Sequence, residues 1–219
     1  MSDDVKARIA ERAARELRPG EVVNLGIGIP NLIPGFLASD SGVVLHTENG
    51  LLGVGPRPQG DEHDPDLIDA AKLPITALPG AAYFDSAESF AMIRGGHIDV
   101  AVLGALEVSA AGDIANWAVP GRDVLGVGGA MDLVVGARRV IVTMTARTSR
   151  GESKVVTECS YPLTAAGVAD VIVTELSVFR IRDGELRLTE LLGGATVDDV
   201  TDVTSAPFVI ALEESHATR

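Results

Sequence analysis

A glutamate stands between a short apolar run and a glycine-rich turn in the first quarter of the chain. Residues 43–45 are Val, Val and Leu, and Glu48 follows three positions later, directly before Asn49-Gly50. Ligands of open α/β sheets bind at the carboxyl ends of the strands, where this glutamate would lie. The same Asn-Gly pair between two apolar runs is also typical of a tight β-hairpin, with Glu48 as an ordinary turn residue. Local sequence leaves both interpretations open.

Acyl transfer is the chemistry that Glu48 would perform. A carboxylate attacks an activated acyl group when it is positioned and removed from water. The reaction also needs hydrogen-bond donors directed at the tetrahedral oxyanion. Segment 119–130 contains Gly126, Gly128 and Gly129, and successive backbone amides of such a loop can form an anion-binding concavity. The alternative is that this loop is a plain connector.

The chain has no pattern typical of a metal site. Its four histidines lack metal-ligand spacing, and its one cysteine has no cysteine neighbour. Zinc sites usually combine closely spaced ligands, so we expect no metal. These residues are His46, His63, His97, His216 and Cys159.

Two further patterns lie at predicted strand ends. His46 precedes Glu48 by two residues, so on an extended strand both side chains would point to the same side. His46 would then either touch the acid or pack as a partly buried residue. Gly26 and Gly28 follow a predicted strand and resemble the start of a dinucleotide-binding motif, but the third glycine of that motif is missing.

Apolar periodicity predicts helices and strands that alternate through most of the chain. Helices are expected over 3–17, 30–38, 67–71, 86–93, 132–137 and 196–203, and strands over 21–25, 43–45, 75–78, 98–103, 140–144 and 168–174. Residues 178–188 predict a hairpin that turns at Asp183-Gly184, and the residues after the last helix predict a tail. This order is typical of an α/β fold with a single open, mainly parallel sheet flanked by helices and a C-terminal antiparallel hairpin. No composition shift marks a linker, so we predict one domain over residues 1–219.

Composition and charge narrow the possible functions. The chain has 219 residues and a formal net charge of −13, which argues against nucleic acid or an anionic membrane as a partner. The net charge does not exclude an anionic substrate, because binding one requires only hydrogen-bond donors in the site itself. The acidic N-terminus lacks an apolar segment, and no apolar run is long enough to span a membrane, so we predict neither a signal peptide nor a transmembrane helix. A single cysteine is typical of a reducing compartment, and we predict a cytoplasmic protein.

Seven short runs match a known enzyme family in order, between residues 5 and 205. They are 23–30 (VNLGIGIP), 48–56 (ENGLLGVGP), 64–68 (DPDLI), 78–81 (LPGA), 89–97 (SFAMIRGGH), 115–117 (ANW) and 128–133 (GGAMDL). With these runs the chain resembles the B (beta) subunit of the class I 3-oxoacid CoA-transferases. That family includes succinyl-CoA:acetoacetate and succinyl-CoA:3-oxoadipate transferases, and the resemblance implies their NagB/RpiA-like fold.

The resemblance also implies roles for individual residues. The family's nucleophile is the glutamate of the Glu-Asn-Gly motif, here Glu48, which passes through an acyl anhydride to a glutamyl-CoA thioester in ping-pong kinetics. The backbone amide matching Gly129 belongs to the oxyanion hole. Expected positions for CoA binding are Asn49, Gly50, Gly53, Gly55, Gly26, Gly28 and Gly128. No permanently bound cofactor is implied, because coenzyme A is both substrate and covalent intermediate.

A partner follows from the same resemblance. The family pairs this chain with an A (alpha) subunit of similar size in a heterodimer or heterotetramer that acts on acyl-CoA and small carboxylic acids. Two alternatives are a lyase or thioesterase of the same fold, and a non-catalytic binding subunit. The motifs do not distinguish acetoacetate from 3-oxoadipate as the acceptor, and they leave the pathway open.

The chain departs from the family pattern at four places. Thr47 replaces a serine and keeps the hydroxyl group. Segment 69–71 (DAA) stands where Asn-Ala-Gly is usual. Arg57 and segment 145–151 add arginines, which indicate either an unusual acid such as a dicarboxylate or drift of surface residues.

Overall fold

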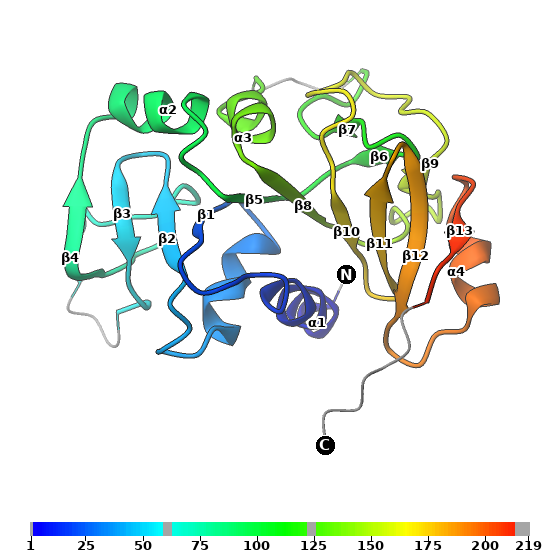
Figure 1. The fold of residues 1–219 in the computed structure, drawn as a ribbon, viewed down its shortest axis with the longest axis horizontal. Helices are drawn as coiled ribbons and strands as arrows, with labels where there is room; N and C mark the ends of the chain where they lie inside the picture. Colours follow the sequence, from blue (N-terminus) through cyan, green and yellow to red (C-terminus); the bar gives the residue numbers. More distant parts are fainter. Residues whose placement is uncertain (1, 59–62, 122–125, 213–219) are drawn as a thin grey trace.

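The computed structural model describes residues 2–58, 63–121 and 126–212. A ten-stranded sheet crosses this part of the chain, and the five strands from β10 to β2 at its centre are parallel (Figure 1). Its strands in spatial order are β13 (Val209–Ile210), β12 (Glu185–Leu191), β11 (Ser177–Arg182), β10 (Val171–Val173), β8 (Arg139–Thr143), β5 (Val100–Leu103), β1 (Val22–Leu25), β2 (Val44–Thr47), β3 (Leu51–Val54) and β4 (Ala77–Tyr83). The predicted α/β class with a mainly parallel sheet is confirmed.

Helices cover both faces of the sheet. Helices α2 and α3 lie on one face, and α1 with the 3-10 helix η1 lies on the other (Figure 1). The helices are α1 (Asp3–Ala14), η1 (Pro30–Phe36), α2 (Ser86–Arg94), α3 (Ala130–Gly136) and α4 (Val197–Val203). Because both faces are covered, the central strands must be apolar on both sides.

Strand β5 shows this double burial. Ala101 and Leu103 belong to the core under α2 and α3, whereas Val100 and Val102 belong to the core under α1. Alternate side chains of a strand point to opposite faces, so a continuous apolar run is required here. A strand with one wet face would instead alternate apolar and polar residues.

The predicted caps and turns of three elements are confirmed. Asp85 accepts a hydrogen bond from the backbone amide of Glu88 at the start of α2. Thr196 and Asp199 form a reciprocal capping box at the start of α4, which satisfies backbone donors that the helix leaves open. The C-terminal hairpin joins β11 to β12 through Asp183-Gly184, both with positive φ.

The helix predicted over 67–71 is wrong. The Asp69 carboxylate accepts hydrogen bonds from the backbone amides of Ala71 and Leu73, at 2.8 and 2.9 Å. Asp side chains that bind nearby amides compete with helix formation. This segment is therefore a turn, bridged at Ile68 and Pro74.

Two strand predictions also need correction. The strand expected to stop before Pro79-Gly80 continues through them as β4, because β4 is the edge of the sheet and an edge strand tolerates a missing donor. The residues expected to form a tail after α4 include β13, which pairs in parallel with β12. A three-stranded sheet of β7 (Ile114–Ala115), β6 (Glu107–Ser109) and β9 (Val155–Val156) was not predicted, because its strands are too short to show a period.

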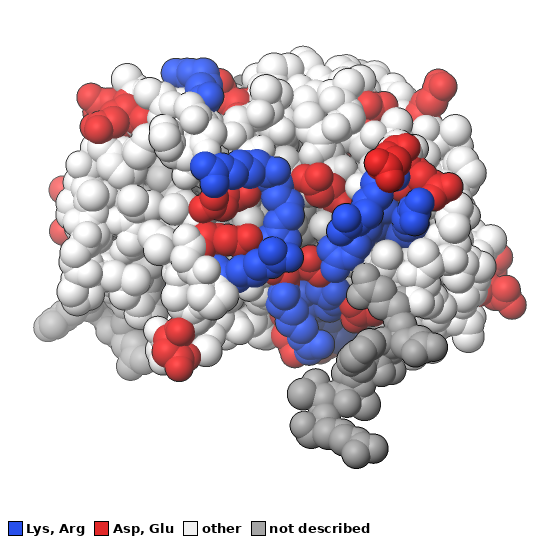
Figure 2. Space-filling model, in the orientation of Figure 1, with Lys and Arg blue, Asp and Glu red and all other residues white. Residues whose placement is uncertain are grey.

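A buried carboxylate ties α1 to the sheet. The Glu16 side chain is 7% exposed and accepts hydrogen bonds from Arg12 and Arg180 at 2.9 Å, while Arg139 lies 3.7 Å away. Burial alone would raise the pKa of Glu16, but the hydrogen bonds and charges of Arg180 and Arg12 outweigh it and lower the pKa. Figure 2 shows acidic and basic side chains interleaved in the middle of the face of the molecule that it displays.

None of the described helices is long and apolar enough to cross a membrane. The prediction of one domain over residues 1–219 stays a prediction.

Gly136 sets how closely α3 approaches α2. A Cβ atom at this position would lie 2.3 Å from the carbonyl oxygen of Ile93. We therefore expect Gly136→Ala to push the helices apart and lower the free energy of unfolding by about 1–3 kcal/mol. Urea unfolding followed by circular dichroism measures this, with Gly35→Ala as the control because no atom lies within 4 Å of its added Cβ. Equal losses in both variants would contradict the packing argument.

Candidate active site

Glu48 lies in the turn between β2 and β3. These strands pair antiparallel, while β2 pairs in parallel with β1 on its other side. Both predicted positions are therefore confirmed: Asn49-Gly50 closes a hairpin, and Glu48 stands at the carboxyl edge of the parallel strands. Gly50 has a φ of 129°, and a Cβ there would lie 2.2 Å from the Phe84 carbonyl oxygen, so only glycine permits this turn.

Glu48 faces a cavity of about 600 Å³. The cavity is bordered by the ends of β1, β2 and β5, by the segment after β7, and by the loop that leads into α3. Its lining residues are Gly26, Ile27, Glu48, Leu103, Gly104, Ala105, Leu106, Asn116, Trp117, Gly126, Val127, Gly128, Gly129, Ala130 and Leu133. Among these residues Glu48 alone is ionisable, so its carboxylate borders a largely apolar space. A cavity of this size and lining suits a small ligand with one reactive polar group.

The glycine loop predicted from the sequence meets the glutamate in space. A Cβ built on Gly129 would lie 4.0 Å from Cγ of Glu48 and 2.9 Å from Cζ of Phe90. Gly128 and Gly126 line the same cavity. Residues 122–125 of the predicted loop lie outside the described residues. The loop therefore brings backbone close to the glutamate, where a side chain would not fit.

Asn24 contacts the glutamate directly, and the sequence analysis missed it. Its Nδ2 donates a hydrogen bond to Glu48 Oε2 at 3.0 Å, and Asn24 is fully buried. The parallel register of β1 and β2 places Asn24 opposite His46. A polar residue inside the apolar run 22–25 was the available signal, since a buried amide needs a specific partner.

His46 touches Asn24 rather than the acid itself. Its Nδ1 lies 3.1 Å from Asn24 Nδ2, its Nε2 lies 3.2 Å from Ser89 Oγ, and its ring stacks on Phe84 with 5.8 Å between centroids. The side chain is 3% exposed, and burial lowers the pKa of His46 to about 4. His46 is therefore a neutral polar core residue at neutral pH.

Two other missed residues border the cavity, Asn116 and Trp117. The Trp117 indole donates to the Leu163 carbonyl oxygen at 3.2 Å. The Asn116 amide oxygen accepts from Thr164 Oγ1 at 2.6 Å. Both follow β7 of the small sheet, which the sequence did not predict, so only the matching run at 115–117 indicated them.

The remaining predicted glycines divide into two groups. Gly26 lines the cavity, and a Cβ there would lie 3.2 Å from the Val102 carbonyl oxygen. Gly53 and Gly55 instead pack closely against Ala81 and Thr76, with added Cβ atoms at 3.1 and 2.5 Å. Strand packing thus accounts for glycine at these two positions, and their predicted contact with CoA stays a prediction.

Gly28 and Asn49 also lie outside the cavity lining. Gly28 has a φ of 98°, a backbone conformation that glycine adopts readily and other residues rarely adopt. Asn49 is exposed, accepts a hydrogen bond from Thr47 Oγ1 and donates one to the Ile68 carbonyl oxygen at 2.8 Å. The hydroxyl of Thr47 therefore has a structural partner in the turn.

Two of the arginines that depart from the family pattern, Arg57 and Arg147, have neighbours other than the glutamate. Arg57 borders a separate small hollow together with His46 and Asp69. Arg147 donates to the Asp202 carbonyl oxygen near α4. Neither arginine belongs to the described lining of the Glu48 cavity. The choice between an unusual acid and surface drift stays a prediction.

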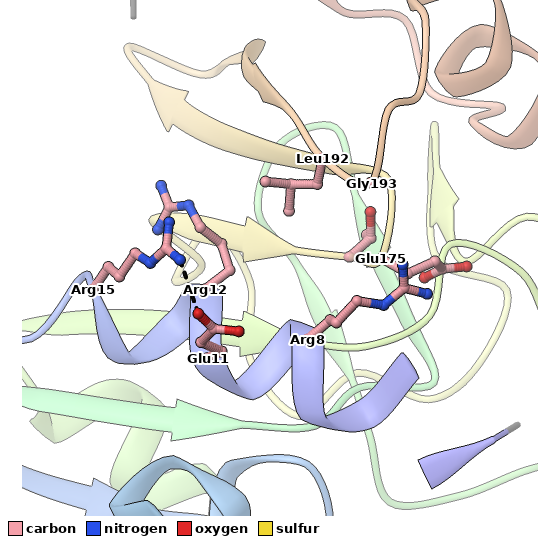
Figure 3. Close-up of a pocket in the computed structure, with 8 residues that line it drawn as sticks. Arg8, Glu11, Arg12, Arg15, Glu175, Leu192 and Gly193 are labelled. Carbon is pink, nitrogen blue, oxygen red and sulfur yellow. Dashed lines mark hydrogen bonds and ion pairs between the residues drawn. The ribbon is translucent and has the colours of Figure 1, made fainter. Parts of the chain in front are cut away.

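A further hollow, of about 110 Å³, lies on the α1 side of the sheet (Figure 3). Arg15 pairs with Glu11 at 2.9 Å, and Arg12 pairs with Glu16 and Glu190 at 2.9 and 2.6 Å. Because of these ion pairs, the residues around this hollow belong to the charge network that holds α1. The described residues contain no group of three or more His, Cys, Asp or Glu side chains that could hold a metal ion.

Residues 6–202 match the family model described as coenzyme A transferase. The probable B subunit of a succinyl-CoA:3-ketoacid coenzyme A transferase from Bacillus subtilis is 50% identical over 95% of this chain and 96% of its own. The beta subunit of the acetate CoA-transferase from Escherichia coli is 48% identical over 96% of both chains.

A solved structure shares the fold. The apoenzyme of the acyl-CoA transferase YdiF from Escherichia coli superposes with a TM-score of 0.77 at 22% identity, over 96% of this chain. The present chain spans 42% of that longer chain. The two proteins therefore share this fold over less than half of the YdiF chain.

The buried neutral state of His46 predicts a pH dependence of stability. The unfolded chain takes up a proton on this residue near pH 6.5, whereas the folded chain does so only near pH 4. Between these values the unfolded state binds more protons, so the free energy of unfolding falls as the pH falls. From pH 7.5 to 4.5 we expect wild type to lose about 2–3 kcal/mol more than His46→Asn. Urea unfolding at both pH values measures the difference, and equal losses would contradict it.

Proposed function

The chain belongs to the coenzyme A transferase family, and from this premise we propose that Glu48 is its covalent nucleophile. The proposed reaction moves CoA from succinyl-CoA to a 3-oxo acid, either acetoacetate or 3-oxoadipate. One observation carries the proposal: the Glu48 carboxylate borders a largely apolar cavity beside the Gly129 backbone and is held by the neutral amide of Asn24. Relatives named as succinyl-CoA:3-ketoacid transferase subunits support the choice of substrates.

The proposed chemistry has two half-reactions. A Glu48 oxygen attacks the thioester carbonyl carbon of the acyl-CoA, the carbon–sulfur bond breaks, and an acyl-glutamyl anhydride and CoA thiolate result. The thiolate then attacks the glutamyl carbonyl carbon, which releases the first acid and leaves a glutamyl-CoA thioester. The second acid attacks this thioester and reverses the steps, so ping-pong kinetics are expected. The apolar lining supports these steps because it offers few side-chain groups that would hold water beside the intermediates.

The backbone amide of Gly129 is the proposed donor to the developing oxyanion. A donor acts in this way when it lies about 3 Å from the oxygen that gains charge. The distance of 4.0 Å between Glu48 Cγ and a Cβ built on Gly129 supports this role. Gly128 and Gly26 line the same cavity and are proposed to contact CoA, together with Asn49, Gly50, Gly53, Gly55 and Gly28.

The proposed partner is an A (alpha) subunit, in a heterodimer or heterotetramer. Relatives of similar length are named as B or beta subunits, whereas this chain spans only 41% of a human mitochondrial succinyl-CoA:3-ketoacid transferase. CoA is proposed as substrate and covalent intermediate with no permanently bound cofactor, and the protein is proposed to be cytoplasmic. A panel of 3-oxo acids, scored by 3-oxoacyl-CoA formation in the reconstituted complex, distinguishes the two acceptors.

Incubation of the complex with acyl-CoA alone tests the nucleophile. We expect the peptide that contains Glu48 to gain the mass of one CoA less one water, because the glutamyl thioester accumulates without a second acid. Glu48→Gln keeps the size of the side chain but loses the carboxylate, so it should form no adduct. Peptide mass spectrometry provides the measurement.

Glu88→Gln is the matched control, since Glu88 is an exposed carboxylate on α2. It should form the adduct at the wild-type rate. Free CoA or carbon dioxide released without an acceptor would favour a thioesterase or lyase. Full activity of Glu48→Gln would favour a non-catalytic subunit.

Gly129→Ala tests the proposed oxyanion donor. The added methyl group would lie 2.9 Å from the Phe90 ring, so either this ring or the backbone at position 129 must shift, which disturbs the backbone beside the glutamate. We expect the rate of adduct formation to fall about 10- to 100-fold, less than the roughly 100- to 1,000-fold for complete loss of one oxyanion donor, because the shift displaces the amide without removing it. Rapid-quench kinetics measure the rate, with Gly35→Ala as the control. An unchanged rate in Gly129→Ala would remove this residue from the proposed site.

A further inference from the structure

Three buried polar side chains form a chain of hydrogen bonds behind Glu48. Asn24 Nδ2 lies 3.0 Å from Glu48 Oε2 and 3.1 Å from His46 Nδ1, and His46 Nε2 lies 3.2 Å from Ser89 Oγ. Asn24 and Ser89 are fully buried and His46 is 3% exposed. The side chains come from β1, β2 and α2, so the chain of bonds links the glutamate to both the sheet and a covering helix. The proposed reaction assigns no task to His46 or Ser89.

Only one arrangement of protons satisfies all three contacts. An ionised carboxylate only accepts hydrogen bonds, so the group facing Glu48 must be the amide nitrogen of Asn24. Two acceptors lie near the second hydrogen of that nitrogen: His46 Nδ1 at 3.1 Å and the His46 carbonyl oxygen at 3.5 Å. The nearer one, Nδ1, can accept only when it carries no proton. The imidazole hydrogen is then on Nε2 and is donated to Ser89 Oγ.

The opposite orientation of the amide loses these bonds. If the Asn24 amide turned over, its Oδ1 would face the Glu48 carboxylate, and two acceptors would meet. If the imidazole carried its proton on Nδ1, that N–H would face the Asn24 N–H. The first change removes the donor to Glu48. The second change favours the first, because a turned-over Asn24 Oδ1 would accept a hydrogen bond from Nδ1–H, so the tautomer of His46 influences the orientation of Asn24. Burial keeps His46 neutral at neutral pH, as its lowered pKa shows.

We propose that His46 and Ser89 are positioning residues, which fix the amide of Asn24 so that it donates to Glu48 and holds the carboxylate toward the cavity. Ser89 Oγ accepts a hydrogen bond from Nε2–H and thereby gives this imidazole tautomer a buried acceptor. His46 accepts from Asn24 and thereby selects the amide orientation. Asn24 then fixes one oxygen of Glu48 and leaves the other for attack. This inference rests on the proposed function and adds residues to the same site.

Rapid-quench kinetics of adduct formation in the complex with the A subunit test the proposal. Ser89→Ala should lower the rate about 10-fold and His46→Leu about 100-fold, because small displacements of a reacting group reduce rates by such factors. His46→Asn should stay within about 5-fold of wild type, since its amide oxygen can accept near the position of Nδ1. Inhibition by free CoA should be unchanged in all three, because CoA binding does not use the orientation of Glu48.

Ser177→Ala is the matched control. Ser177 is 1% exposed and its hydroxyl lies 2.9 Å from Thr174 Oγ1, so the variant loses a buried hydroxyl and one side-chain bond, as Ser89→Ala does. It lies on β11, five strands from β2 in the sheet, and should keep the wild-type rate. Equal rate losses in both serine variants would show a general packing effect and overturn the proposal.

Nitrogen NMR of histidine-labelled complex gives a second readout that needs no activity. At pH 7 the signal lost in His46→Asn should be that of a neutral imidazole protonated on Nε2. A charged imidazole or an Nδ1 proton would overturn the proposal even if a variant fails to fold. Adduct formation at the wild-type rate in Ser89→Ala and His46→Leu would overturn it while leaving Glu48 as the nucleophile. No adduct in wild type would instead reject the proposed function, and this inference with it.

Discussion

The register between β1 and β2 is the constraint on which the site depends. These parallel strands pair Asn24 with His46, and this pairing brings the Asn24 amide to the carboxylate that follows β2. A shift of one residue would turn Asn24 to the other face of the sheet. The Glu48 carboxylate would then lose its described donor, although every residue of the glutamate motif would still be present.

The turn after β2 supports the same geometry from the other side. Gly50 allows the chain to reverse directly after Glu48, with the Phe84 carbonyl oxygen in the space where a side chain would stand. The hairpin therefore does not compete with the sheet-edge position of the glutamate. It is what keeps the glutamate at the edge, because a longer connection would let the side chain move away from the Gly129 backbone.

Local patterns predicted those features that depend on neighbouring residues in the chain. The Asp85 cap, the turn at Asp183-Gly184 and the glutamate at a strand end are of this kind. Asn24 was missed because its role depends on which strands lie side by side, and strand order is not a local property. Strand β4 was cut short at Pro79 because a proline stops a central strand, and only the finished sheet shows that β4 is an edge. The short strand β13 was missed because two residues carry no period.

Glu16 and Glu48 show how surroundings divide the tasks of two carboxylates. Glu16 is buried among Arg12, Arg180 and Arg139 and joins α1 to the sheet. Among the described residues, no cation lies within ion-pair distance of Glu48, and its donor is a neutral amide. An arginine would add the attraction between two opposite charges to its hydrogen bonds, so it would hold the carboxylate more tightly and draw charge from its oxygens. A neutral donor fixes the direction of the carboxylate while leaving more of its charge available to attack an acyl group.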